Sequence, residues 1–223
     1  MTEQTTKVAD NKTLLIFVAT AVVATVLAAG LLSGRYMEKS RPMTPDAKLQ
    51  IALQAFRSGY DQTALSILTP LAKEGNAKAQ YWLADIYIDD DPNSKPDVAK
   101  ALVLLENSAA QGFVPAERRL GDQYLRGTKL IQDFGKARDW LYKAAVAGDA
   151  NAQEEMGHIF ALGLATPQDL PQAYAWYEIA TLHGDGLARI MRDDLLKRMS
   201  PAEVDKGEQT VRQIASTIKP AKK

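Results

Sequence analysis

The chain has 223 residues, of which 46% are hydrophobic and 24% are charged, so it can form one domain with a sizeable core plus a short appendage. Its 27 lysines and arginines balance its 27 aspartates and glutamates, and this balance argues against a nucleic-acid-binding protein. The absence of cysteine excludes disulfides, thiolate nucleophiles and cysteine-ligated metal sites.

An uncharged apolar segment follows a short polar tail at residues 1–12. Residues 13–34 (TLLIFVATAVVATVLAAGLLSG) carry no charged side chain and are apolar on every side. A helix rises about 1.5 Å per residue and the hydrocarbon core of a bilayer is about 30 Å thick, so we predict a transmembrane anchor here. A signal peptide cleaved near Ala28 is the alternative, although the apolar run exceeds the roughly 7–15 residues of a typical signal core.

Basic residues flank the predicted anchor on both sides. Lys7 and Lys12 precede it, and Arg35, Lys39 and Arg41 follow it, so the charge count favours a cytoplasmic carboxyl side by one residue. Single-span bacterial proteins with a short amino-terminal tail commonly export the large domain that follows. On this ground we predict an inner-membrane protein with a periplasmic domain, with a cytoplasmic domain as the alternative. The polar residues 35–44 are predicted to be a tether.

The following residues, 45–199, repeat with a period of 36 or 37 residues. Alanine recurs at 64, 101, 137 and 173, glycine at 75, 112, 148 and 184, and a second alanine at 79, 116, 152 and 188. Large apolar residues three and four positions after the first alanine lie on one face of a helix. We therefore predict an all-α fold of two-helix hairpins, with units starting near residues 61, 97, 133 and 169.

Glycine and polar residues mark the helix ends in each unit. The recurring glycine suits the left-handed backbone that ends a helix, and short polar side chains can cap the helix that follows. The predicted caps are Asn76, Asp97, Asp133, Asp149, Asp169 and Asp185. Small residues at 84, 121 and 157 are predicted to let the two helices of a hairpin approach closely, opposite alanine pairs of the first helix.

Further helices are predicted to close both ends of the array. Residues 45–58 form one, with Leu49, Leu53 and Phe56 facing inward. Ser200-Pro201-Ala202-Glu203 combines an N-cap, a first-turn proline and a capping-box glutamate, so residues 200–218 are predicted to form a capping helix. Residues 219–223 are predicted to be a disordered tail.

These residues resemble the Sel-one-like repeat, a variant of the tetratricopeptide hairpin with the pattern A-x2-W-[YL]-x2-A-A-x2-G-x3-A-x3-L-G-x2-Y-x2-G. The match is closest over residues 133–163 and extends with substitutions over about residues 50–199. Asp90 replaces the later glycine of the first unit, and the fourth unit has Arg192, Asp193 and Leu196 in place of the large, small and aromatic residues.

The resemblance implies a right-handed α-solenoid that binds a protein or peptide partner on a concave face made of first helices. Residues five and six positions after the first alanine lie off the packed stripe and are the candidates for this binding. They are Glu106, Asn107, Tyr142, Lys143, Glu178 and Ile179.

The sequence contains no catalytic motif, phosphate-binding loop or dinucleotide fingerprint, so we predict a non-enzymatic protein without cofactor or metal. His158 is interpreted as a packed or surface residue and His183 as a residue at a helix carboxyl end. The acidic loop at residues 89–94 lacks the ligand spacing of a calcium loop. Adjacent Glu154 and Glu155 are expected to point in different directions and not to act together as acid and base.

We therefore predict a membrane-anchored scaffold or adaptor of the bacterial cell envelope that recruits a protein partner. The alternative is a protein that binds, or acts weakly on, a small molecule or cell-wall ligand in the same groove. It rests on cysteine-rich relatives thought to bind peptidoglycan-like ligands, and the absence of cysteine weakens it.

Overall fold

The structure, a computed structural model, describes residues 43–88, 97–128 and 131–218. The chain divides into residues 1–43 and residues 44–223, and the fold described here is that of the second unit. The predicted polar tail, the membrane anchor, residues 35–42 of the tether, the acidic loop and the carboxyl-terminal tail lie outside the described residues. None of the helices in the described ranges is long and apolar enough to cross a bilayer.

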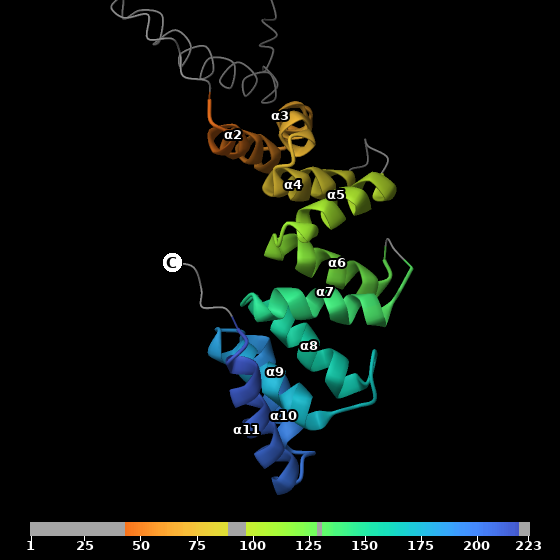
Figure 1. Cartoon of the computed structure of the whole chain (residues 1–223), viewed down its shortest axis with the longest axis vertical. Helices are drawn as coiled ribbons and strands as arrows, with labels where there is room; N and C mark the ends of the chain where they lie inside the picture. The colour runs from red at the N-terminus through yellow and green to blue at the C-terminus, as the bar shows by residue number, and fades with distance from the viewer. Residues whose placement is uncertain (1–42, 89–96, 129–130, 219–223) are drawn as a thin grey trace, which may run out of the picture. The chain divides into compact units, whose positions relative to one another are not determined.

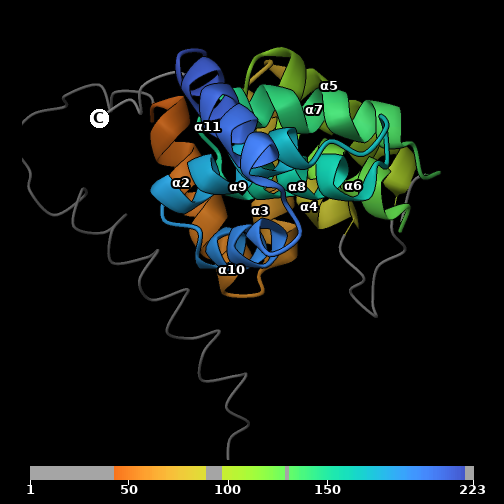
Figure 2. The ribbon, with the colours of Figure 1, turned by 90° about the horizontal axis from the view of Figure 1, so that it is seen from below.

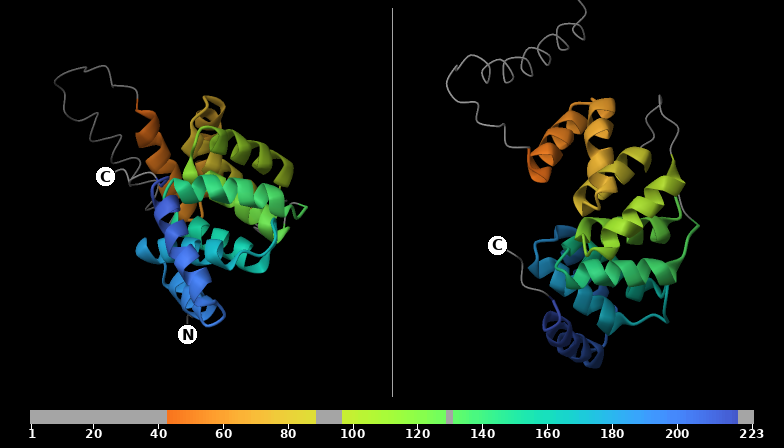
Figure 3. Two further views of the ribbon diagram at one scale, coloured as in Figure 1. Left: turned by 60° about the horizontal axis from the view of Figure 1, so that its bottom comes forward. Right: turned by 45° about the horizontal axis from the view of Figure 1, so that its top comes forward.

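All regular structure in the described residues is α-helical, as predicted, and consists of ten helices (Figure 1). Most helices pack chiefly against those before and after them in sequence. The two views of Figure 3 show this succession along the unit. The helices are α2 (Pro45–Arg57), α3 (Asp61–Lys73), α4 (Ala77–Ile88), α5 (Val98–Ala110), α6 (Val114–Arg126), α7 (Phe134–Val146), α8 (Ala150–Leu162), α9 (Leu170–Leu182), α10 (Gly186–Leu196) and α11 (Pro201–Ala215).

The predicted turn glycines and caps are confirmed. The glycines at 75, 112, 148 and 184 all have φ between 75° and 98°, a left-handed backbone that disfavours residues with a Cβ. At one such turn the Asp149 amide donates to the Ala144 carbonyl, which closes the helix end. Each predicted polar cap accepts a hydrogen bond from a backbone amide of the following helix, at 2.8 to 3.1 Å.

The glycines inside second helices serve a different contact from the one predicted. A Cβ on Gly121 of α6 would lie 2.5 Å from Leu141 of α7, and one on Gly157 of α8 would lie 2.5 Å from Tyr177 of α9. Both partners belong to the first helix of the next hairpin. The prediction of close approach is confirmed, but its assignment to the two helices of one hairpin is wrong.

The buried apolar residues form a series of clusters along the array, which suits a structure built from repeats. Alanines and leucines dominate the clusters, with Trp176 the largest fully buried side chain. Small side chains let successive helices lie close, and each large side chain fills the space beside them. The core of each repeat is therefore completed by its neighbour.

The last helix, α11, folds back along the array instead of extending it. Ser200 and Glu203 form the predicted capping box at its start. The helix packs against α9 as well as following α10, and a Cβ on Gly207 would lie 2.6 Å from the Tyr174 ring. Ile214 packs against the cluster that contains Leu141 and Trp176. Figure 2 shows α11 on the same side of the unit as α5 and α7.

Candidate functional site

Four of the six predicted binding residues lie on exposed parts of α5 and α7. Glu106 and Asn107 are exposed on α5, and Tyr142 and Lys143 are exposed on α7. Because α5 and α7 are the first helices of consecutive hairpins, these residues occupy equivalent places in the repeat. We call these four residues, together with Val103, the first-helix surface. Val103 of α5 is 56% exposed and was not predicted, since an aliphatic residue beside Leu104 and Leu105 reads as core.

Tyr142 is the exposed aromatic ring of this surface. It is 46% exposed, and its ring stands edge-on to Trp176, with 6.0 Å between the ring centroids. Trp176 itself is buried in the core, so it gives Tyr142 a rigid backing. The next residue, Lys143, places its ammonium nitrogen 3.9 Å from the centroid of the Trp140 ring. The surface therefore offers one positioned aromatic side chain with a cation beside it.

The predicted pair on α9 does not belong to the same surface. Ile179 is only 2% exposed, so the expectation that it lies off the packed face is wrong. The physical reason is that α9 is packed by α8, α10 and α11 together. Glu178 is half-buried and accepts a hydrogen bond from Arg192 at 2.5 Å. Its carboxylate is therefore already paired with a side chain of the same chain.

His183 has a structural position, in agreement with its interpretation as a helix-end residue. It is the C-cap of α9, and its Nδ1 lies 2.8 Å from the Gln153 side-chain oxygen. Gln153 is fully buried and donates to the Ala145 carbonyl at the end of α7. Two repeats earlier, the side-chain amide of Gln111 donates to the side-chain oxygen of Gln80 at 2.8 Å. These contacts link the turn of one hairpin to the turn of the preceding one.

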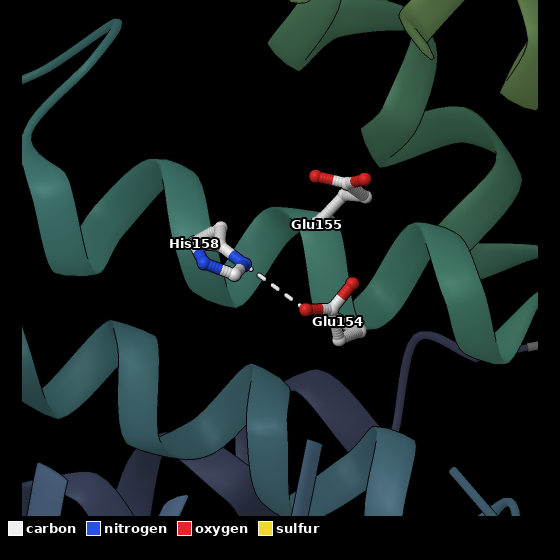
Figure 4. Close-up of side chains that lie close together, drawn as sticks. All are labelled: Glu154, Glu155 and His158. Atoms are coloured by element: carbon white, nitrogen blue, oxygen red, sulfur yellow. Dashed lines mark hydrogen bonds and ion pairs between the residues drawn. The ribbon is translucent and has the colours of Figure 1, made fainter. Parts of the chain in front are cut away.

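A cluster that sequence reasoning missed lies on α8 (Figure 4). Glu154, Glu155 and His158 bring one ligand atom each to within 4.8 Å of one another. His158 Nδ1 lies 2.9 Å from Glu154 Oε1, and Glu154 is 8% exposed. Glu154 and Glu155 were not expected to act together as acid and base, and this stays a prediction; His158, three and four residues later on the helix, is a neighbour of both side chains.

The cluster continues onto α6 through charged side chains. Arg126 donates to Glu155 at 3.0 Å, and Arg118 contacts Asp122 and Asp149 at 3.1 and 3.5 Å. Burial raises the pKa of the Asp122 and Glu155 carboxyls, and each carboxyl group near Glu155 raises its pKa further. The hydrogen bond with Glu154 raises the pKa of His158 and favours its protonated form.

Comparison with known proteins identifies the repeat. Residues 77–113, 114–149 and 150–185 each match the Sel1 repeat, also called the Sel-one-like repeat. The chain therefore contains three Sel1 repeats, each beginning with the second helix of one hairpin and ending with the first helix of the next. None of the curated proteins matches the chain.

Solved structures with a similar fold include a Sel1 repeat protein from Oxalobacter formigenes. It is 29% identical with a TM-score of 0.53, and the match covers 58% of this chain and 97% of that one. A protective antigen of uropathogenic Escherichia coli strains, which displays an SLR fold, is 22% identical with a TM-score of 0.47. The match covers 79% of this chain and 46% of the antigen, so the chain spans less than half of the antigen's length.

Proposed function

We propose that the protein is a membrane-anchored scaffold of the bacterial cell envelope that recruits a protein partner through the first-helix surface. Residues 13–34 anchor it in the inner membrane, and the repeats lie on the periplasmic side. It acts by binding and carries out no reaction of its own.

The observation that carries this proposal is the exposed Tyr142 ring backed by buried Trp176. Residues that dominate protein interfaces are enriched in tyrosine, tryptophan and arginine. A ring that is already held by its neighbours loses little conformational freedom when a partner covers it. Arrays of stacked helical hairpins present extended surfaces for binding, and three Sel1 repeats match α4 to α9.

The partner is tested by crosslinking the full chain in cells and identifying the crosslinked proteins by mass spectrometry. We expect one partner to be recovered reproducibly, and Tyr142→Ala to lower its yield about tenfold or more, as loss of a central aromatic contact does. Tyr60→Ala is the matched control, because Tyr60 is 39% exposed at the turn before α3 and lies off the first-helix surface. Equal losses from both variants, or from neither, would contradict the proposal.

The anchor is supported by the uncharged run of residues 13–34, which is long enough to span a bilayer as a helix. The periplasmic placement rests on the short amino-terminal tail before this run and is proposed against a charge count that favours the cytoplasmic side by one residue. A topology reporter fused after Lys223 tests the compartment, with activity expected from a periplasmic reporter and not from a cytoplasmic one. Release of the chain from membranes by carbonate extraction would argue against the anchor.

A further inference from the structure

Glu154, Glu155 and His158 have the side-chain chemistry and spacing of a metal site carried on one helix. His158 follows Glu155 by three residues and Glu154 by four, so it lies one helical turn from both; in Figure 4 the Glu154 carboxylate contacts His158, and Glu155 lies at the opposite edge of α8. Helical bundles that bind metals use a Glu-x-x-His pair of the same spacing, together with ligands from other helices. Glu154 is over nine-tenths buried, which distinguishes the group from acidic residues gathered on an open surface.

The separation of the donor atoms suits a bound metal ion. Zinc binds histidine nitrogen and carboxylate oxygen at about 2.0–2.2 Å, so two ligand atoms of a tetrahedral site are roughly 3.3–3.6 Å apart. His158 Nδ1 and Glu154 Oε1 lie 2.9 Å apart as a hydrogen-bonded pair, so a bound ion has to separate them by about half an ångström. The third ligand, Glu155, has its oxygen within 4.8 Å of both, a distance that a side-chain rotation can close.

The charge at this place differs from that in the preceding repeat. The equivalent residues one repeat earlier are Arg118, Arg119 and Asp122, and there Arg119 pairs with Asp85 of α4 at 3.1 Å. In the following repeat, Glu155 replaces the arginine while Asp122 stands in the place of Asp85. The position therefore carries a positive side chain, Arg119, in one repeat and a negative one, Glu155, in the next.

The arginine that pairs with Glu155 does not block the site permanently. Arg126 reaches Glu155 from α6, and its side chain is 61% exposed, whereas the Glu155 side chain is 15% exposed. The long, exposed Arg126 side chain can move into water, and a metal ion would then supply the positive charge beside the largely buried Glu155 carboxylate. Glu155 can therefore exchange Arg126 for a metal ion without a change in the helices.

We propose that Glu154, Glu155 and His158 bind a divalent first-row transition metal, with zinc as the expected ion. Imidazole nitrogen together with carboxylate oxygen suits zinc and its neighbours, whereas calcium and magnesium prefer oxygen ligands alone. Three protein ligands leave at least one coordination position for water or for a ligand brought by another molecule. The site lies on the second helix of its hairpin and is separate from the first-helix surface.

The test is calorimetric titration of zinc chloride into the full chain, purified in detergent without a histidine tag. We expect one zinc ion per chain, and His158→Ala to weaken the affinity tenfold or more, since even loss of a residue behind a ligand costs 10–100-fold. His183→Ala is the matched control, because the chain has only these two histidines, and it should change the affinity less than twofold.

Two further variants keep the test decisive if His158→Ala folds poorly by circular dichroism. Glu155→Arg restores the charge found one repeat earlier, where Arg119 pairs with an aspartate, and it should abolish zinc binding in a folded protein. Arg126→Ala frees Glu155 and should tighten binding. Absence of saturable one-to-one binding by the wild type, or equal binding by the wild type and Glu155→Arg, would overturn the proposal.

Discussion

At the scale of single residues, the most informative positions are the glycines within helices. Glycine in a helix interior costs about 1 kcal/mol relative to alanine, so a glycine that recurs at 121 and 157 needs a packing reason. The sequence was sufficient to predict close approach there. It could not show which helix approaches, because a period of 36 residues is the same for a partner in the same hairpin and for one in the next.

The Gly157 contact predicts a loss of stability on substitution. Gly157→Ala would bring a Cβ within 2.5 Å of the Tyr177 ring, so we expect the free energy of unfolding to fall by about 1–3 kcal/mol despite the better helix propensity of alanine. Gly186→Ala is the control, since its Cβ would meet nothing within 4 Å at the start of α10 and should be neutral or stabilising. Urea denaturation measures both, and equal effects would refute the close contact.

Residue types alone were also insufficient for the α8 cluster. As an adjacent pair, Glu154 and Glu155 do not predict a common site, and His158 alone reads as a packed or surface residue. The helical spacing of three and four residues, applied to glutamate and histidine together, would have found the group. Donor spacing within a predicted helix is therefore the signal that was available.

At the scale of helices, the boundaries follow from local chemistry, whereas the position of α11 does not. Caps and left-handed glycines are properties of a few neighbouring residues, and the structure confirms them. The packing of α11 on α9 depends on residues about 30 positions apart, such as Gly207 and Tyr174. This long-range contact explains why Ile179 could not be identified as buried from its place in the repeat.

The capping box gives a prediction for the stability of α11. Ser200 accepts from the Glu203 amide, and Glu203 accepts from the Ser200 amide, so we expect Ser200→Ala to cost about 1 kcal/mol of unfolding free energy. Hydrogen exchange should rise first in α11. Gln213→Ala, near the end of the same helix, serves as the control and should leave exchange at its start unchanged.

The same box should respond to acid in a defined direction. The hydrogen bonds from Ser200 lower the pKa of Glu203 below its ordinary value of 4.5. A lowered carboxyl pKa means that the contribution is fully present above 4.5 and is lost as the pH falls through the lowered pKa. The stability difference between the wild type and Glu203→Ala should therefore shrink on acidification, and a difference that grows would contradict this account.

At the scale of the whole helical unit, packing between successive helices makes stability local. Such an array behaves as a series of units coupled to their neighbours, in which a weakened unit opens before distant ones. Periodicity in the sequence was enough to predict this architecture, because the same alanine, glycine and aromatic positions return in each repeat. Its binding partner could not be predicted, because exposed residues are not constrained by packing.

Two core substitutions should therefore have spatially separate effects. Leu68 is fully buried in the cluster of α2 to α4, and Met156 is 1% exposed in the cluster around α7 to α9. Either residue changed to alanine should cost about 2–5 kcal/mol locally. Hydrogen exchange should rise in α2 to α4 for Leu68→Ala and in α7 to α9 for Met156→Ala. A uniform rise for both would indicate a single cooperative unit.

The contact between a glycine of one hairpin and a large residue of the next also bears on how such a chain can change in length. Residues 114–149 contain both Gly121 and Leu141, and residues 150–185 contain both Gly157 and Tyr177. A segment that is duplicated or deleted between these residue limits therefore contains both the glycine and the large residue that packs against it. Segments cut instead as whole hairpins would separate the glycine from its partner at every junction. The new contact that a copy of the matched segment creates lies inside a hairpin, between a first and a second helix, and not at the glycine.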